Sequence, residues 1–310
     1  MRSVLTRACS LLLSRGKICL HLSMKYSSAL LFFSVVLVPF CCRAEVIIGG
    51  DTLYVVQPGD CLISIGARLG VNWTAIAEQN CLDINERLQI GDQLMVNTRR
   101  IVPWVLENGI IINIPEGMLY FFKKGVLSAF PVGLGKSDRK WRTPIGKFKI
   151  TDKAKDPTWH VPLSIQEEMR MNGQEVETMR APGPNNPLGR YALRTSLAEI
   201  LIHETIWPTT VHQFLSHGCI RMLPEHIEQL FQLVAIGTSG QIIYEPVKVA
   251  DTGDGRIFLE VHRDIYKMVG PLDEEVKKRI AARNLSDKVD WEKINTIINE
   301  KSGIAEDITL

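Results

Sequence analysis

The chain has 310 residues and a nearly balanced charge, with 36 lysine and arginine residues against 34 aspartate and glutamate residues. Six of the basic residues and none of the acidic ones lie in residues 1–44, which leaves 30 basic against 34 acidic residues and a formal net charge of −4 in the remainder. That charge gives no electrostatic basis for binding nucleic acid, and we expect no nucleic-acid partner.

Residues 1–44 are predicted to be a secretory signal peptide. An apolar run at 29–42 follows a basic segment and closes with Cys42-Arg43-Ala44, which predicts cleavage after Ala44. The run is shorter than the ~20 residues that span a bilayer, and this argues against a permanent anchor. The sequence leaves open whether translation starts at Met1 or at Met24.

Residues 52–97 are predicted to form a small βααβ module, with a strand at 54–57, helices at 62–69 and 72–79, and a strand at 88–96. This order, with turns at Gly59-Asp60 and Gly91-Asp92, resembles a lysin-motif (LysM) domain, which binds glycans. The resemblance implies a glycan-binding groove near four residues, Gly59, Asp60, Asn80 and Leu82. The alternative is a degenerate module that only packs against its neighbour.

Three cysteines remain after residue 44: Cys61, Cys81 and Cys219. In an oxidising compartment Cys61 and Cys81 can pair and leave Cys219 as the free thiol. The first two flank the loops that the LysM resemblance assigns to the groove, so we expect a disulfide between them. A bridge that closes about twenty residues contributes ~3 kcal/mol. The alternative is that both are small buried residues.

The remainder is predicted to be mainly β-structure followed by a helical tail, so the fold class is α+β. Residues 100–246 contain short apolar runs separated by Gly and Pro turns. Residues 153–199 show little periodicity and are expected to be a binding loop or lid. A helix is expected from Pro224 to Gly237. Residues 247–310 predict a hairpin and two amphipathic helices with a packing role.

The strongest chemical signal is SHGCIRM at residues 216–222. A thiol attacks carbonyl groups only as the thiolate, so Cys219 needs a nearby base. Both His203, at the end of another apolar run, and His217 are candidates. Gly218 lets a carbonyl group approach and leaves backbone N–H groups free to bind an oxyanion. The planar guanidinium of Arg221 suits a substrate carboxylate.

This motif is similar to the signature of the YkuD-type L,D-transpeptidases, which remodel bacterial peptidoglycan. The likeness covers about residues 104–246 and includes, in family order, stretches at 133–135, 143–148, 155–159 and 182–189. The chain departs from the family pattern at Glu204, where a small residue is usual. If a backbone carbonyl at that position holds the base, any side chain can serve there, and His203 stays the expected base; the alternative is that the carboxylate raises the pKa of His203 or changes the acceptor that it uses. The loop 207–214 also lacks the usual glycine-containing character.

The resemblance implies an acyl-transfer reaction on a tetrapeptide stem of peptidoglycan. Cys219 would attack the diaminopimelate–D-alanine bond with His203 as base, and Arg221 would bind a carboxylate. His217 and Ser216 would have supporting places. The acceptor would be an amine of another stem or of an outer-membrane lipoprotein lysine. The resemblance also implies a periplasmic location, inhibition by carbapenems and no cofactor.

Three other interpretations remain at this stage. Water as the acceptor would make the protein an L,D-carboxypeptidase. A non-catalytic peptidoglycan-binding protein would use only the module at 52–97. His203, His212, His217 and Cys219 are ligand types of zinc, but their spacing fits no metal pattern, so we expect no metal and place His212 on the surface.

Overall fold

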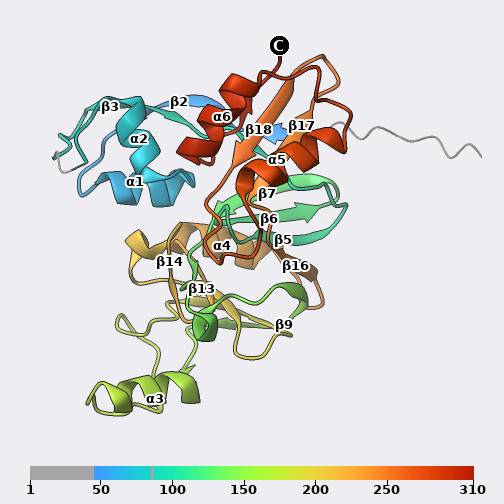
Figure 1. The fold of residues 1–310 in the computed structure, drawn as a ribbon. Coiled ribbons are helices and arrows are strands. Elements are labelled where there is room, and N and C mark those ends of the chain that lie inside the picture. Colours follow the sequence, from blue (N-terminus) through green and yellow to red (C-terminus); the bar gives the residue numbers. More distant parts are fainter. Residues whose placement is uncertain (1–44, 85–86) are drawn as a thin grey trace, which may run out of the picture. The chain divides into compact units, whose positions relative to one another are not determined.

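The computed structural model describes residues 45–84 and 87–310 (Figure 1). The predicted signal peptide, residues 1–44, lies outside the described residues. None of the helices within the described ranges has the length and apolar character needed to cross a membrane.

An eight-stranded sheet carries the main core, and its strand order is β15-β13-β12-β9-β16-β5-β6-β7. The pairs β13/β15 and β16/β5 are parallel, and the other neighbours are antiparallel. The strands are β5 (Gly109–Asn113), β6 (Met118–Lys123), β7 (Val126–Pro131), β9 (Gly146–Lys155), β12 (Tyr191–Thr195), β13 (Leu201–Glu204), β15 (Ile220–Met222) and β16 (Ser239–Ile243). The predicted α+β class is confirmed.

Helix α4, Pro224–Leu233, packs on β12 and β13 of this sheet. Pro224 occupies the first turn of the helix. A backbone N–H in that turn has no acceptor within the helix, so proline, which lacks the N–H, loses no hydrogen bond there. Ile227 and Leu230 are fully buried in the main core, as their spacing on one helix face predicts. The predicted end at Gly237 is too late, because the helix ends at Leu233.

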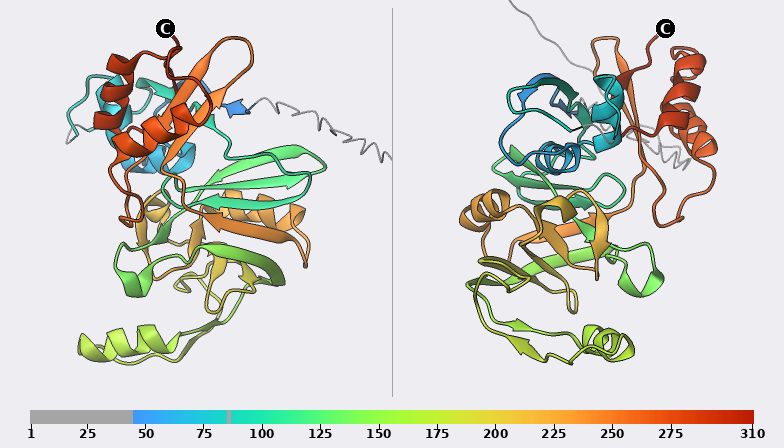
Figure 2. Two further views of the ribbon diagram at one scale, coloured as in Figure 1. Left: turned by 45° about the vertical axis from the view of Figure 1, so that its right-hand side comes forward. Right: turned by 90° about the vertical axis from the view of Figure 1, so that its left-hand side faces the viewer.

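The segment that we expected to be a loop, 153–199, contains a helix, and it also contains β12 and the end of β9 in the main sheet. Helix α3, Leu163–Met171, lies between two short paired strands, β10 (Trp159–His160) and β11 (Met179–Arg180). No residue of α3 is buried, and Figure 2 shows the helix standing away from the sheet. A helix that buries no face needs no apolar stripe, which is why periodicity did not reveal it.

Smaller elements surround the sheet near its β13–β15 edge. Strand β8 (Leu134–Gly135) pairs in parallel with β14 (Phe214–Ser216). Two 3₁₀ turns, η1 (Arg139–Trp141) and η2 (Pro208–Thr210), lie in the loops that flank these strands.

The module at 52–97 has the predicted βααβ order. Strand β2 (Asp51–Val55) pairs antiparallel with β3 (Gln93–Asn97), and α1 (Leu62–Leu69) and α2 (Trp73–Gln79) lie between them in the sequence. Asn72 caps α2 through its side chain, as expected. The second strand begins later than the predicted residue 88, because Asp92 accepts a hydrogen bond from the Gln89 N–H and holds a turn there.

The predicted disulfide is not formed, since Cys61 and Cys81 are free and exposed. Cys61 precedes α1, and Asp60 before it accepts a hydrogen bond from Tyr54 of β2. Cys81 follows Asn80, whose side chain bonds both the N–H and the C=O of Met95 at 2.8 Å, and Met95 pairs with Leu53 in the middle of that ladder.

The tail contains the predicted hairpin and both helices. Strands β17 (Val247–Asp251), β18 (Ile257–Val261) and β19 (Glu306–Asp307) form a sheet of their own. Helices α5 (Leu272–Ala281) and α6 (Trp291–Glu300) bury their apolar stripes against this sheet. Two further strands, β1 (Ile47–Ile48) and β4 (Arg100–Ile101), pair with each other.

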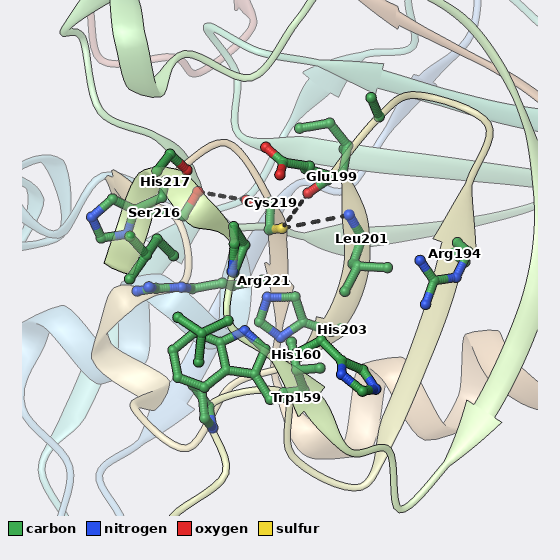
Figure 3. Close-up of a pocket in the computed structure, with 18 of the residues that line it drawn as sticks. Trp159, His160, Arg194, Glu199, Leu201, His203, Ser216, His217, Cys219 and Arg221 are labelled. Carbon is green, nitrogen blue, oxygen red and sulfur yellow. Dashed lines mark hydrogen bonds between the residues drawn. The ribbon is translucent and has the colours of Figure 1, made fainter. Parts of the chain in front are cut away.

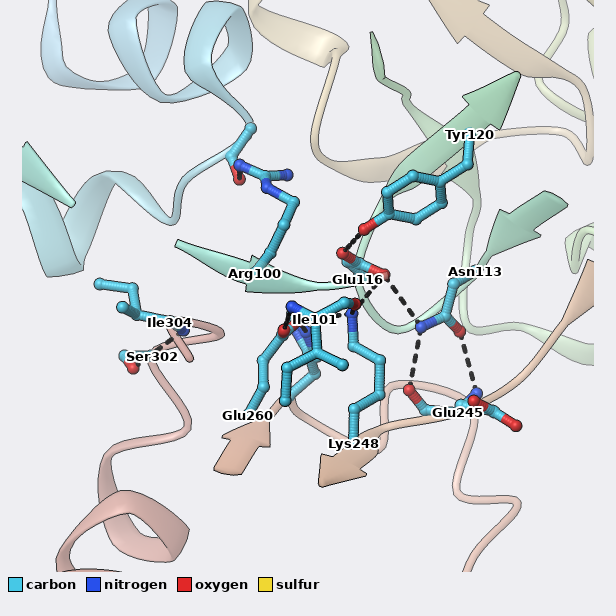
Figure 4. A network of polar contacts seen from close by, with 12 residues as sticks. Arg100, Ile101, Asn113, Glu116, Tyr120, Glu245, Lys248, Glu260, Ser302 and Ile304 are labelled. Carbon is cyan, nitrogen blue, oxygen red and sulfur yellow. Dashed lines mark hydrogen bonds and ion pairs between the residues drawn. The ribbon is translucent and has the colours of Figure 1, made fainter. Parts of the chain in front are cut away.

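A buried polar network joins the tail, residues 247–310, to Ile101 and Glu116 (Figure 4). The Lys248 ammonium of β17 lies 2.9 Å from a Glu116 carboxylate oxygen and 2.7 Å from one of Glu260, and it donates to the Ile101 carbonyl. Burial alone would raise the pKa of Glu260, but Lys248 and a hydrogen bond from His262 lower it to about 2. Tyr120 donates to the other Glu116 oxygen. All of these charges have partners.

Candidate active site

Strand alternation places the candidate residues on one face of β13 and β15. These strands run in parallel with Ile202 opposite Ile220 and His203 opposite Arg221. Ile202 and Ile220 are fully buried in the main core. Because successive side chains point to opposite faces, His203, Arg221 and the residue two before it, Cys219, share the other face.

A cavity of about 720 Å³ opens on that face. Cys219, His203, Arg221, Ser216 and His217 all line it, so the structure brings together every catalytic or substrate-binding side chain that the sequence indicated (Figure 3). Residues 158–165 and Met169, from β10 and part of α3, also line it.

The Cys219 thiol is held by backbone groups. Its Sγ–H donates to the Glu199 carbonyl at 3.3 Å, and its sulfur accepts the Leu201 N–H at 3.5 Å. Burial raises the pKa of Cys219, and the Leu201 N–H and the Arg221 charge act weakly in the opposite direction. The thiol is therefore uncharged at neutral pH, and a base must remove its proton during attack.

His203 is set up as that base. Its Nδ1 lies 2.6 Å from the Glu204 backbone carbonyl, and since a carbonyl only accepts, Nδ1 carries the proton. Burial lowers the pKa of His203 to about 4, against the effect of that hydrogen bond and with a smaller contribution from Arg221. The ring is neutral at pH 7, and Nε2 is left as a proton acceptor.

The unusual Glu204 serves His203 through its backbone. Its carboxylate turns away to accept the Arg190 N–H at 3.0 Å and packs where a side chain at Gly189 would clash. Burial raises the pKa of Glu204. The contact supports the interpretation in which a backbone carbonyl holds the imidazole and any side chain can stand at this position, and the Glu204 carboxylate does not raise the pKa of His203.

Ser216 closes the nucleophile loop. Its Oγ donates to the Cys219 carbonyl at 2.6 Å and accepts the Gly218 N–H at 3.1 Å. The Gly218 amide is thus occupied and cannot bind an oxyanion in this conformation, which corrects our expectation. The N–H groups of Cys219 and His217 have no acceptor among the described residues.

His217 is directed toward α3. Its Nε2 lies 2.7 Å from a Glu168 carboxylate oxygen, and its ring meets the edge of Trp141 with centroids 4.4 Å apart. Burial lowers the pKa of His217, and Lys136 adds to this while Glu168 opposes it. The interaction that could give His217 its expected supporting role is therefore the contact with Glu168, a residue that the sequence analysis did not identify.

Arg221 is anchored by its backbone and leaves its guanidinium free. Its N–H and C=O both bond Gly133 at 2.8 Å. The guanidinium carbon lies 5.8 Å from the ring centroid of Trp207, and it has no carboxylate partner in the described part of the chain. Burial lowers the pKa of Arg221, yet a guanidinium stays charged. It can bind an anion that enters the cavity.

The structure does not support a zinc site built from the histidines. His203, His217 and His212 each use a ring nitrogen on a different partner, and His212 bonds the Glu116 carbonyl at 3.1 Å. His212 is partly buried, where a surface position was expected, and burial lowers the pKa of its ring to about 3. Within the described ranges, the one three-residue group with metal-ligand spacing is Glu116, Glu260 and His262, where the Lys248 ammonium already supplies the cation.

The expected glycan-binding residues mostly hold the module together. Asp60 accepts from Tyr54 at 2.5 Å and pairs with Arg68 at 3.1 Å, and Asn80 is fixed to β3. Leu82 packs against the module core. Gly59 forms a left-handed turn with open space at its Cα. A cavity of about 360 Å³ begins at Asp60 and is also lined by Cys61, Leu62, Ile63, Trp73, Ile84, Arg87 and Leu88.

Comparison with known proteins identifies two regions. The profile of the YkuD family, described as the L,D-transpeptidase catalytic domain, matches residues 107–249, and that of the LysM domain matches residues 54–97. ErfK/SrfK of Salmonella typhimurium, described as a probable L,D-transpeptidase, is 29% identical over 230 residues, 71% of this chain and 74% of that protein. YbiS of Escherichia coli, described likewise, is 34% identical over 178 residues, 56% of this chain and 57% of that protein.

Among solved structures, the catalytic domain of an E. faecium L,D-transpeptidase acylated by ertapenem is 20% identical. The match covers 44% of this chain and 98% of that one, with a TM-score of 0.33. The family profiles define the class, an acyl-transferring enzyme domain joined to a LysM domain. YqjB of Bacillus subtilis, described as a putative L,D-transpeptidase, is 30% identical over 150 residues, 46% of this chain and 70% of that protein. The chain belongs to the YkuD-type L,D-transpeptidases.

Proposed function

We propose that Cys219 and His203 form a thioester with a tetrapeptide stem of peptidoglycan and pass the acyl group to an amine. The observation that carries this proposal is the shared strand face, which holds Cys219, His203 with a free acceptor nitrogen, and Arg221 with a free guanidinium in one cavity. Nucleophile, base and anion ligand are the parts that acyl transfer needs.

In acylation, the sulfur of Cys219 bonds to the carbonyl carbon between diaminopimelate and D-alanine while the thiol proton moves to His203 Nε2. The carbonyl oxygen becomes an oxyanion, for which we propose the free N–H groups of Cys219 and His217 as donors. The C–N bond then breaks, and His203 returns the proton to the leaving amine of D-alanine. Arg221 binds a carboxylate of the peptide.

In the second half-reaction, His203 takes a proton from the acceptor amine, which attacks the thioester and releases the thiol. An amine of a second stem would give a cross-link, and a lysine of an outer-membrane lipoprotein would give an attached protein. The neutral thiol and neutral imidazole support general-base catalysis during attack, in place of a preformed thiolate–imidazolium pair.

The remaining expectations extend this proposal to the whole chain. The LysM domain would bind peptidoglycan glycan strands near Gly59 and Asp60. We divide the chain into a signal peptide at 1–44, the LysM module at 52–97, the catalytic domain at 100–246 and the tail at 247–310. Such a protein would act in the periplasm, and the Cys219 thiol would be acylated by carbapenems.

The test is incubation of the protein with a purified disaccharide-tetrapeptide, with and without an added amine, followed by mass spectrometry. We expect a thioester on Cys219, release of D-alanine and an amine adduct. Cys219→Ala should lower turnover at least ~10³-fold, while Cys81→Ala, a matched change at an exposed thiol outside the cavity, should retain it. Release of D-alanine without adduct would make the protein an L,D-carboxypeptidase, and no thioester would overturn the proposal.

A further inference from the structure

Arg194 lies in the same row of the sheet as the nucleophile. Arg194 of β12 pairs with Leu201 of β13, and Leu201 is the neighbour of Cys219, to whose sulfur its N–H donates at 3.5 Å. Since adjacent strands lie about 4.8 Å apart, roughly 10 Å separates the Cα atoms of Arg194 and Cys219. An extended arginine side chain spans much of that distance. Figure 3 shows Arg194 and Arg221 on opposite sides of Cys219.

The side chain of Arg194 points to the cavity side of the sheet. Its neighbours in β12, Leu193 and Thr195, are 0% and 4% exposed, so alternation turns Arg194 to the face that carries His203 and Cys219. Arg194 is among the residues that line the cavity. Its position across the sheet differs from that of Arg221, which lies two residues along the nucleophile's own chain.

The charges around the cavity leave Arg194 without an anion. Of the three arginines that line it, Arg180 is bound by the Glu177 carboxylate. Arg194 and Arg221 have no such partner among the described residues. Asp152, opposite Arg194 in β9, uses its carboxylate on the Lys153 N–H. The lining carboxylate, Glu199, makes no ion pair within the described ranges.

We infer that Arg194 is a second carboxylate-binding residue of this cavity and helps to select the donor peptide. A planar guanidinium without a partner is complementary to a carboxylate. Two of them on different sides of the nucleophile fit a peptide with carboxylates on both sides of the reacting carbonyl. This inference rests on the proposed function, because it assigns a substrate feature to the same site. Arg221 takes one carboxylate, and Arg194 takes the side-chain carboxylate of the diamino acid.

The kinetic test compares two tetrapeptide donors, one with a free side-chain carboxylate on its diamino acid and one with the corresponding amide. The intact enzyme should prefer the free acid by about tenfold in kcat/KM, the effect of losing one charged hydrogen bond. Arg194→Gln should lower kcat/KM for the free acid by about that factor and leave the amide unchanged. Arg263→Gln, at an exposed arginine outside the cavity, should change neither.

A binding experiment separates this inference from the proposed reaction. Calorimetry with the Cys219→Ala protein measures the affinity for each donor without turnover. The double variant that also carries Arg194→Gln should show no preference for the free acid. If the intact enzyme turns over neither donor but this binding preference persists, the reaction is wrong and the carboxylate site stands. Equal losses on both donors, or no loss on either in both experiments, would overturn the assignment of Arg194.

Discussion

The buried network around Lys248 and the cavity around Cys219 both withdraw ionisable side chains from water, but only the network pairs all of its charged groups. Lys248 has acceptors on Glu116, Glu260 and Ile101. In the cavity, Arg221 has no carboxylate partner, and His203 keeps one ring nitrogen free. The paired cluster has no bonding capacity left for a ligand, whereas the cavity has kept it.

This difference separates stability from function. Removing one member of a fully paired buried cluster leaves an uncompensated charge and destabilises the fold. Removing a cavity residue that has no protein partner takes away little native-state bonding and should act on substrate instead. The same kind of substitution therefore has opposite consequences in the two regions, which the following variants test.

The largest effect is expected from Lys248→Met. This change leaves Glu116 and Glu260 buried without their cation, so the free energy of unfolding should fall by about 3–5 kcal/mol. Urea denaturation measures it. The matched control is Arg256→Met, which removes an exposed pair with Asp254 and should leave the free energy of unfolding almost unchanged. Equal losses for the two variants would show that burial of the Lys248 network adds nothing.

The pH dependence of acylation tests the uncharged state of the cavity. Because burial lowers the pKa of His203 to about 4, the base stays neutral throughout the range above pH 5. The rate of thioester formation should therefore show no fall between pH 7 and 5 and should drop tenfold per unit below about 4. A midpoint near 6.5, that of an unperturbed histidine, would contradict this account.

The lowered pKa of His203 also makes the stability of the fold depend on pH, and the experiment must take this into account. The unfolded chain protonates His203 near pH 6.5, before the folded protein does, so stability is lost as pH falls from there to about 4. Rates below pH 5 should therefore be read immediately after a pH jump, with circular dichroism to confirm folded protein. Cys61→Ser and Cys81→Ser remove the two exposed thiols from the background.

Much of the fold could be predicted because strand alternation and helix stripes are local features of the sequence. The β-rich region, the βααβ order and the two tail helices follow from such patterns. Helix α3 was missed because it buries no face. The predicted disulfide was wrong because the number of cysteines says nothing about the distance between them. The loop that carries Cys81 is held by hydrogen bonds from Asn80 to Met95, fifteen residues further along the chain, which the sequence does not reveal.

The site was predictable where residue type alone decides chemistry. Cys219, His203 and Arg221 were found from motif and spacing. The hydrogen-bond partner of each polar group was not predictable, because several donors and acceptors of equal quality compete for it. Nothing in the motif reveals that Ser216 takes the N–H of Gly218, or that His217 bonds an exposed helix.

The smallest effect is expected from Glu168→Gln. Glu168 is paired, like the residues of the Lys248 network, but its partner His217 lines the cavity. The carboxylate of Glu168 bonds His217 at 2.7 Å and lies 3.9 Å from Lys136, but these side chains are a quarter to two-fifths exposed. A pair so accessible to water contributes ~1 kcal/mol or less. We expect kcat/KM to fall by up to about fivefold, with no change in the melting temperature.

Glu167→Gln is the matched control, since its carboxylate neighbours Glu168 on α3 and pairs with Arg170 in solvent. It should leave kcat/KM unchanged. If Glu168 acts by orienting His217, its substitution should have no further effect in a His217→Gln background, because the bond is already lost. Additive losses would mean that Glu168 acts elsewhere in the cavity. Glu168 would then affect activity through its charge and not through its bond to His217. In that case the presence of an ion-pair partner would not distinguish residues that stabilise the fold from residues that act on the substrate.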